Sequence, residues 1–350
     1  MTTSTVKPKK SISALKIGAV YIGAVIGAGF ASGQEILQFF GYFGLWGIAG
    51  LALATGLFGF LGMKVMFIAY RTGKNSYKQV IDTVGGRHLG PLINFVITFF
   101  LFGILVAMVA GTGAVFEQEF GLPLYLGLAI MAGLSGITVA SGLGRIIDAI
   151  SILVPFLIIA VLGVGLCIIL SGNLDLTWSS PASAALPRWH LSGLAYVSYN
   201  LTLSVPILVA MGTSAEPQSL KKGAFLGALG LGVSALVILL TILAAAPGII
   251  GFEIPMLVVA GKVSPTIRLL YTLALISEVY TTAISSLYGF VARVVPENSR
   301  WFKPFTIIVA ACSFLAGQLG FSRIVATVYP VAGIGGFIFI AALFYYRDQA

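Results

Sequence analysis

Ten runs of apolar residues follow one another along the chain, and short polar links separate them. A transmembrane helix needs about 20 consecutive, mostly apolar residues. Runs of this kind lie near residues 13–41, 44–70, 90–116, 122–140, 146–171, 191–211, 222–246, 266–292, 304–320 and 323–346. The pattern predicts an all-α integral membrane protein with ten transmembrane helices, which together form a single membrane domain over residues 1–350.

The composition supports this prediction and excludes several classes of protein. Hydrophobic residues make up 58% of the chain and charged residues 9%, whereas soluble domains carry about 25% charged residues. A soluble enzyme, a disordered protein and a nucleic-acid-binding protein are therefore excluded, and the expected partner is the lipid bilayer.

The net charge of +9 reflects membrane topology. If the N-terminus is cytoplasmic, only four of the 20 basic residues fall outside, and the remaining 16 fall inside. The four outer residues are Arg188, Lys262, Arg268 and Arg323. The positive-inside rule then predicts a multi-pass protein of the cell membrane, a bacterial inner membrane, with both termini cytoplasmic.

The first apolar run contains an unusual number of glycines. They are Gly18, Gly23, Gly27, Gly29 and Gly33. Each costs about 1 kcal/mol relative to alanine in a helix interior, so the pattern predicts a break in the helix around residues 27–33. A break would free backbone groups that an ion or a small polar ligand can satisfy. The alternative is close helix packing through Gly23 and Gly27.

Two polar residues, Gln34 and Glu35, follow this predicted break. A carboxylate within a membrane span costs about 2.5–3.5 kcal/mol on insertion scales. Glu35 therefore indicates a cavity or a charged partner. The alternative is a hydrated position near the outer mouth, where Gln34 and Glu35 would only cap or pair.

The sixth run concentrates polar side chains in its middle. They are Ser198, Tyr199, Asn200, Thr202 and Ser204. Pro206 follows, removes a backbone donor and clashes one turn earlier, near Thr202. We therefore expect a second broken helix, five spans after the first. Interrupted helices at matching positions of two halves indicate a transporter built from an inverted repeat. The alternative is hydrogen bonding between helices.

The eighth run carries an acidic residue and a stripe of hydroxyl groups. Thr281, Thr282, Ser285 and Gly289 follow Glu278 at helical spacing, so all five lie on one face. A carboxylate beside hydroxyls suits a sodium ion, or a proton bound by Glu278 itself. The alternative is a neutral Glu278 that bonds a backbone carbonyl and has no role in transport.

The chain resembles a known family at these same positions. GAVIGAGFASGQE in the first run, YNLTLSVP in the sixth and the polar eighth run are similar to the YkvI-like group of bacterial membrane proteins. That group lies within the amino acid–polyamine–organocation superfamily. The resemblance implies a LeuT-type fold with two five-helix repeats of opposite topology, about 13–171 and 191–346, and with broken first and sixth helices. The proline-rich segment 247–265 then resembles an outer re-entrant hairpin.

The resemblance also implies functional residues. A sodium site would take the carbonyl oxygens of Gly23 and Ile26, and hydroxyl groups of the eighth helix. Those hydroxyls would come from Thr281, Thr282, Ser285 or Ser286, with Glu278 beside them. The broken sixth helix would place Tyr199, Asn200 and Thr202 near a substrate.

These observations together predict a secondary active transporter in which a cation drives a small polar organic solute, an amino acid or a related amine. Backbone amides near Ala28–Ser32 would meet an anionic group of the solute, and aromatic rings would cover its apolar part. The expected solute-binding residues are Ala28, Gly29, Phe30, Ser32, Gln34, Glu35, Tyr196, Tyr199, Asn200 and Thr202. The alternatives are a ligand sensor on a transporter scaffold and a passive channel.

Enzyme activity is not expected, because the apolar runs contain no nucleophile with a base and no set of metal ligands. No catalytic residue and no cofactor is therefore predicted. The coupling sodium ion or proton is the one exception.

Overall fold

The computed structural model describes residues 12–73, 77–141, 159–170, 177–296 and 298–346. Within these ranges every regular element is a helix. In chain order the elements are α1 (Ala14–Val25), α2 (Ala28–Ala31), α3 (Gln34–Phe39), η1 (Gly41–Phe43), α4 (Leu45–Thr72), α5 (Tyr77–Phe120), α6 (Leu124–Ser141), η2 (Pro181–Ser183), α8 (Trp189–Gly212), α9 (Pro217–Ala245), α10 (Pro255–Val263), α11 (Pro265–Val294), α12 (Phe302–Gly317) and α13 (Phe321–Tyr345). A further helix, Ile159–Leu170, lies between α6 and η2.

Seven helical segments in this part of the chain are long and apolar enough to cross a membrane. They are α4, Leu89–Phe120 of α5, α6, α8, α9, α11 and α13. Three shorter apolar helices, Ala14–Val25, Ile159–Leu170 and Phe302–Gly317, coincide with the first, fifth and ninth predicted spans. Residues 146–158, half of the fifth predicted span, lie outside the described residues. The helical membrane architecture is confirmed, and the number of ten spans stays a prediction.

The first apolar run is interrupted twice, as its glycines predict. α1 ends at Val25, and the four-residue α2 begins only at Ala28. Gly33 then adopts a left-handed backbone conformation (φ 79°) before α3 begins. A left-handed residue at this point favours glycine, because a Cβ atom strains that conformation.

The sixth apolar run is not broken, and this prediction was wrong. α8 runs from Trp189 to Gly212 as one helix, with Pro206 inside it. Proline removes one backbone donor, and the polar side chains before it stay within the helix. Thr202 Oγ1 donates to Ser198 O at 2.7 Å, and Ser204 Oγ donates to Asn200 O at 2.8 Å. Side chains bonded one turn back along their own helix require no unwinding.

Segment 247–265 contains no long helix, as its prolines predict. A turn leads to α10, a helix of nine residues, and Ser264 caps the start of α11 immediately afterwards. α10 packs against α11 and contacts the first run, because Met256 N donates to Ser32 O at 3.1 Å. The short helix therefore covers the second interruption of that run.

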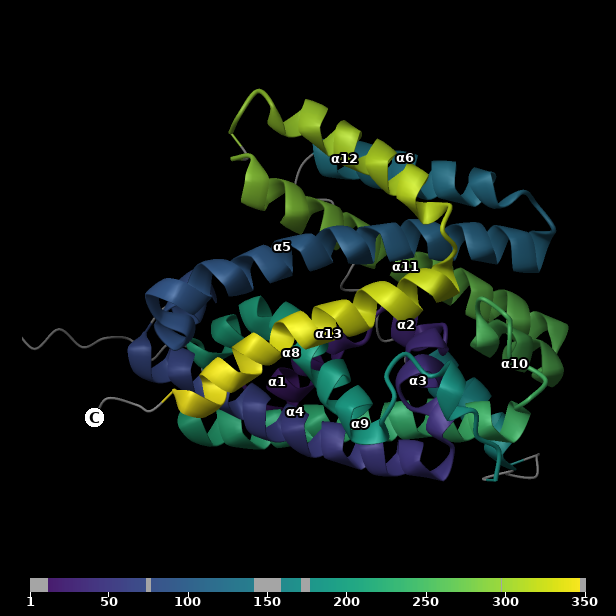
Figure 1. The fold of residues 1–350 in the computed structure, drawn as a ribbon, viewed down its shortest axis with the longest axis horizontal. Helices are drawn as coiled ribbons and strands as arrows, with labels where there is room; N and C mark the ends of the chain where they lie inside the picture. Colours follow the sequence, from purple (N-terminus) through teal and green to yellow (C-terminus); the bar gives the residue numbers. More distant parts are fainter. Residues whose placement is uncertain (1–11, 74–76, 142–158, 171–176, 297, 347–350) are drawn as a thin grey trace, which may run out of the picture.

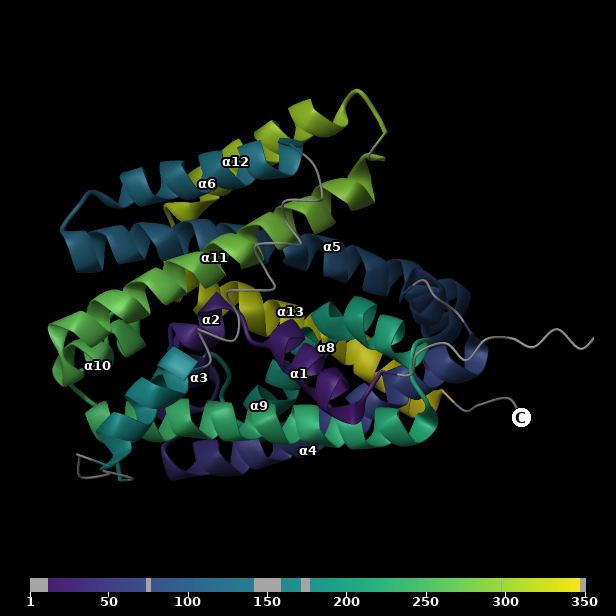
Figure 2. The same ribbon diagram turned by 180° about the vertical axis from the view of Figure 1, so that it is seen from behind.

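The helices form two groups that lie side by side. α1, α4, α8 and α9 pack on one another, and α5, α6, α11 and α12 make up the second group. α13 packs against α5 and α8 and so joins the two groups. In Figures 1 and 2, α6 and α12 form the upper edge, and α4 and α9 form the lower edge. α10 lies at one end of the molecule, and the last turn of α13 lies at the opposite end (Figure 1).

Gly333 tests how closely α13 approaches α8. A Cβ atom added there would lie 2.7 Å from the carbonyl oxygen of Ala195 and 2.8 Å from its Cβ. We expect Gly333→Ala to destabilise the protein by about 1–3 kcal/mol, as overpacking does, and to lower the melting temperature of the purified protein. Gly133→Ala in α6 is the matched control, because nothing lies within 4 Å of its added Cβ. Equal melting temperatures for the two variants would contradict the close approach.

Candidate functional site

The unwound segment Ile26–Gly27 leaves backbone groups without helical partners inside the molecule. Ile26 (φ −70°, ψ 118°) and Gly27 (φ −134°, ψ −174°) are extended, so they end the hydrogen-bond ladder of α1. The last carbonyl groups of a helix lack donors from the helix itself. One of them, the oxygen of Ala24, lies 3.3 Å from Ser204 Oγ of α8, which shares its single hydroxyl hydrogen between this oxygen and Asn200 O.

A cavity of about 240 Å³ lies against this unwound segment. α1, α2, α3, α5, α8, α11 and α13 contribute to its wall, so it lies between the two helix groups. Glu35 and Glu278 both line it, and the described residues of the wall include no lysine, arginine or histidine. A wall with two carboxyl groups and no basic side chain favours a cation or an amine over an anion.

Glu35 lies on α3 and folds back over α2. Its side chain is 5% exposed, and Tyr199 donates a hydrogen bond from its hydroxyl group to Glu35 Oε2 at 2.6 Å. A Cβ atom on Gly29 would overlap the carboxyl group and lie 2.7 Å from its Cδ. The glycine therefore makes room for the carboxyl group beside the cavity.

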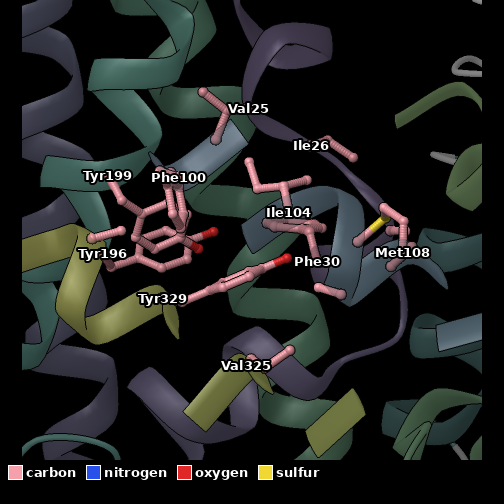
Figure 3. Packing of buried hydrophobic residues seen from close by; sticks show 14 of the residues in the cluster. Val25, Ile26, Phe30, Phe100, Ile104, Met108, Tyr196, Tyr199, Val325 and Tyr329 are labelled. Carbon is pink, nitrogen blue, oxygen red and sulfur yellow. The ribbon is translucent and has the colours of Figure 1, made fainter. Parts of the chain in front are cut away.

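Aromatic rings surround the hydroxyl group that binds Glu35. The ring of Tyr199 lies 5.3 Å from Tyr329, 5.5 Å from Phe100 and 5.6 Å from Tyr196, measured between centroids. These rings come from α5, α8 and α13 and gather beside Ile104 (Figure 3). Tyr199 and Tyr329 line the cavity, so a ligand there meets ring surfaces next to a carboxyl group.

Glu278 lies on α11 at another part of the wall. It is 3% exposed, and its Oε2 atom is buried without a hydrogen-bond partner among the described residues. Thr282 Oγ1 lies 3.5 Å from Glu278 Oε1. A buried acceptor without a partner costs free energy, so this oxygen is available for a cation or a proton.

The hydroxyl groups near Glu278 leave their oxygen atoms free to accept. Thr281 Oγ1 donates to Glu278 O at 3.0 Å, and Ser285 Oγ donates to Thr281 O at 2.7 Å. A hydroxyl group that donates one bond keeps two lone pairs on its oxygen. A Cβ atom on Gly27 would lie 3.7 Å from Thr282 Oγ1, which brings this stripe to the unwound segment.

The structure brings all of the predicted ion-site residues to this one cavity. Its wall includes Gly23, Ile26, Glu278, Thr281, Thr282, Ser285 and Ser286. Of the predicted solute-binding residues, the wall includes Ala28, Gly29, Glu35, Tyr199 and Asn200. Their placement agrees with the sequence pattern, and their roles stay predictions.

The other five predicted solute-binding residues are buried beside the cavity and do not line it. They are Phe30, Ser32, Gln34, Tyr196 and Thr202. Ser32 is used locally, because its hydroxyl group donates to Gly29 O at 2.8 Å and accepts from Gln34 N at 3.2 Å. Thr202 bonds within α8, and the ring of Tyr196 packs on Phe40 with centroids 5.0 Å apart.

Several residues of the wall were missed by the sequence analysis. Leu101, Ile104 and Met108 of α5 resemble any other apolar residues of a span, so no local pattern identifies them. Tyr329 of α13 was also missed. Tyr329 precedes Pro330 in the tenth run, and this polar ring beside a proline is the one signal in the sequence that could have identified it.

Further contacts hold the α10 end of the molecule together. Tyr271 donates to Ala31 O at 2.5 Å, and Met256 N donates to Ser32 O. Arg268 of α11 forms an ion pair with Glu119 of α5, with Nε and Oε2 2.7 Å apart. α10 and α11 therefore contact the end of the interrupted run, and the ion pair joins α11 to α5.

A second polar pocket lies toward the opposite end, between α5 and α11. Asp82, Asn94, Thr98 and Arg293 line it, and its volume is about 720 Å³. Leu101 lies between this pocket and the cavity, because it lines the cavity one turn beyond Thr98. A Cβ on Gly289 would lie 3.4 Å from Leu101 Cδ1.

The contact between Gly29 and Glu35 yields a testable prediction. Gly29→Ala should destabilise the protein by about 1–3 kcal/mol, because the new methyl group overlaps the carboxyl group. In a Glu35→Ala background the same change should cost much less, so the double-mutant cycle should show a large interaction free energy. Thermal unfolding of the purified variants measures it. Gly27→Ala is the control, since its Cβ would meet only Thr282 Oγ1 at 3.7 Å. Additive effects of Gly29→Ala and Glu35→Ala would contradict this geometry.

Solved structures of transporters share this fold. MhsT in complex with L-phenylalanine matches with a TM-score of 0.66 and 16% identity, over 95% of this chain and 89% of MhsT. The inward-facing conformation of Mhp1 matches with a TM-score of 0.67 and 16% identity, over 97% of this chain and 78% of Mhp1. A Na⁺-coupled sialic acid symporter in a substrate-bound outward-open state matches with a TM-score of 0.60 and 12% identity, over 95% of this chain and 79% of the symporter. The LeuT-type fold is therefore confirmed.

Two proteins of Bacillus subtilis (strain 168) are similar in sequence along nearly the whole chain. The uncharacterized protein YyaD is 28% identical over 328 residues, which cover 93% of this chain and 94% of YyaD. The uncharacterized membrane protein YkvI is 33% identical over 338 residues, which cover 95% of both chains. No protein-family model matches the chain. With one third of its residues identical over nearly its full length, this chain belongs to the family of the membrane protein YkvI.

Proposed function

We propose that the protein is a secondary active transporter that moves a small polar organic solute, an amino acid or a related amine, together with a coupling cation. The observation that carries this proposal is the cavity at the unwound segment. It combines free backbone groups, two buried carboxyl groups, a hydroxyl stripe and no basic side chain among the described residues of its wall. The fold supports the same class of function, because the solved structures that share it include a Na⁺-coupled sialic acid symporter and MhsT in complex with L-phenylalanine.

The amino group of the solute would bind at Glu35. The hydroxyl group of Tyr199 donates a hydrogen bond to the carboxyl group of Glu35, and the ring of Tyr329 lies beside that of Tyr199. A cation near aromatic ring faces gains further electrostatic attraction. Ala28, Gly29 and Asn200 would contact the remainder of the solute. The cavity of about 240 Å³ has room for about eight water-sized groups at about 30 Å³ each, so it suits a small amino acid or amine.

The coupling cation would bind at Glu278. Its free oxygen and the hydroxyl oxygens of α11 are hard ligands of the kind that sodium prefers, and carbonyl oxygens of the unwound segment lie on the same wall. These ligands would be Gly23, Ile26, Thr281, Thr282, Ser285 and Ser286. A proton bound by Glu278 is the alternative carrier of the coupling charge, and the experiment below distinguishes it from sodium.

Transport would proceed by movement of one helix group against the other, which exposes the cavity alternately to each side. We place the α10 end outside and both termini in the cytoplasm, as the positive-inside distribution predicts. The pocket lined by Asn94 and Thr98 then lies on the cytoplasmic route, and Leu101 separates it from the cavity. The two repeats would be residues 13–171 and 191–346, with segment 247–265 as the outer hairpin.

Binding and uptake test the proposal directly. Purified protein is heated with a panel of amino acids and small amines, each in sodium and in potassium at two pH values. A ligand that binds only the folded state at about 100 times its Kd stabilises it by about 2.7 kcal/mol. A stabilising solute should then accumulate in proteoliposomes against its gradient when the cation gradient is imposed.

The outcomes of this experiment separate the alternatives. Uptake that requires sodium identifies sodium as the coupling ion, and uptake that follows the pH gradient alone identifies a proton. Binding without flux indicates a sensor, and flux without accumulation indicates a channel. Either of the last two results rejects the transporter proposal.

Glu278→Gln should separate solute binding from coupling. The amide keeps the size of the side chain and removes the negative charge, and a contact to a charged group contributes about 1.5–3 kcal/mol. We therefore expect cation-driven uptake to fall about tenfold or more, while the solute still stabilises the protein. Glu216→Gln is the matched control and should transport normally, because Glu216 is exposed and lies immediately before α9. Cation-driven uptake by Glu278→Gln at the wild-type rate would exclude the coupling role.

A further inference from the structure

A third pocket lies on the outer surface of the helix group that contains α4 and α9. Its volume is about 420 Å³, and it has no residue in common with the central cavity. Apolar side chains from α4 form one wall, and they are Phe60, Met63, Phe67 and Ile68. Three basic side chains, Lys64, Arg71 and Lys221, complete it.

The packing of α4 on α9 explains the position of the pocket. α4 and α9 are antiparallel and approach closely where small residues meet: a Cβ on Gly59 would lie 3.4 Å from Ala228 Cβ, and one on Gly232 would meet Thr55. Larger residues replace these small ones further along α4, at Met63 and Phe67. The space between the two helices then becomes the pocket.

Lys64 occupies an unusual position for a charged residue. It is half-buried within α4, eight residues before the end of the helix at Thr72, which is about 12 Å at 1.5 Å per residue. Arg71 lies in the last turn of α4, and Lys221 lies near the start of α9. All three basic residues are therefore on the side of the pocket that faces the α4–α5 and α8–α9 links. A lysine at this depth extends its ammonium group toward the polar interface along an apolar stem.

The apolar wall is open to the surroundings of the protein. Phe60 is 45% exposed and stacks on Phe344 of α13, with ring centroids 5.7 Å apart. The described residues of the pocket include no aspartate or glutamate. The pocket therefore presents positive charge at one end and an exposed hydrocarbon surface at the other.

We propose that this pocket binds an anionic phospholipid of the cytoplasmic leaflet. The phosphate of its headgroup contacts Lys64 and Lys221, and one acyl chain lies along Phe60, Met63 and Phe67. Basic pockets between transmembrane helices on the cytoplasmic side are suited to anionic headgroups. A soluble anion would satisfy the charges but leave the apolar wall in water, whereas a lipid matches both ends. The site is independent of the transported solute.

The test compares lipids on the purified full-length protein. Binding of phosphatidylglycerol and of phosphatidylcholine is measured by native mass spectrometry and by thermal stability in detergent, for the wild type, Lys64→Gln and Lys221→Gln. Lys222→Gln is the matched control, because Lys222 is exposed on the same helical turn as Lys221 and does not line the pocket. Glycerol 3-phosphate tests the headgroup chemistry without the acyl chains.

We expect the wild type and Lys222→Gln to bind phosphatidylglycerol equally and in preference to phosphatidylcholine. Lys64→Gln and Lys221→Gln should each weaken this binding about fivefold, since one basic residue near an anionic lipid contributes about 1 kcal/mol. Equal losses in Lys221→Gln and Lys222→Gln would indicate diffuse attraction to the surface and overturn the proposal. Stabilisation by glycerol 3-phosphate at the same concentration would identify a soluble anion as the ligand and overturn it as well.

Discussion

The interruption of the first membrane helix is the constraint on which the rest of the structure depends. Buried backbone groups need partners, and water is absent from the bilayer interior. The protein supplies these partners from other helices: Ser204 bonds the carbonyl of Ala24, Tyr271 bonds that of Ala31, and Met256 bonds that of Ser32. α8 therefore contacts the run next to its first interruption, which forms part of the cavity wall, and α10 and α11 contact it at the second interruption.

The sequence predicts this interruption well because its cause is local. Five glycines in sixteen residues weaken a helix wherever it packs. The eighth run is equally informative, because helical spacing alone puts Glu278 and its hydroxyl groups on one face. Both predictions rest on residues that are close together in the chain. The cavity wall includes three of the five glycines, Gly23, Gly27 and Gly29, as well as Glu278 and the hydroxyl groups that follow it.

Predictions that depended on tertiary contacts succeeded less well. Pro206 suggested a break in α8, but the helix is continuous, and the hydroxyl group of Thr202 bonds within it. The choice between a break and a continuous helix depends on neighbouring helices that the local sequence does not reveal. Leu101, Ile104 and Tyr329 reach the cavity only because α5 and α13 pack against α8. Aliphatic side chains carry no chemical signal of their own, so the pattern of one span cannot distinguish a cavity wall from a lipid-facing surface.

The difference between the broken first run and the continuous α8 has a mechanical consequence. α2 is a helix of four residues with non-helical backbone on each side, at Ile26–Gly27 and at Gly33. These two joints separate the direction of α2 from the directions of α1 and α3. α3 is anchored at its far end, where Ser192 bonds the carbonyl of Phe39 at 2.7 Å. α8 is one continuous helix and contacts α1 through Ser204, whose hydroxyl oxygen lies 3.3 Å from Ala24 O. A movement of α8 and α1 relative to α3 would therefore change the backbone at the two non-helical joints around α2, directly beside Glu35.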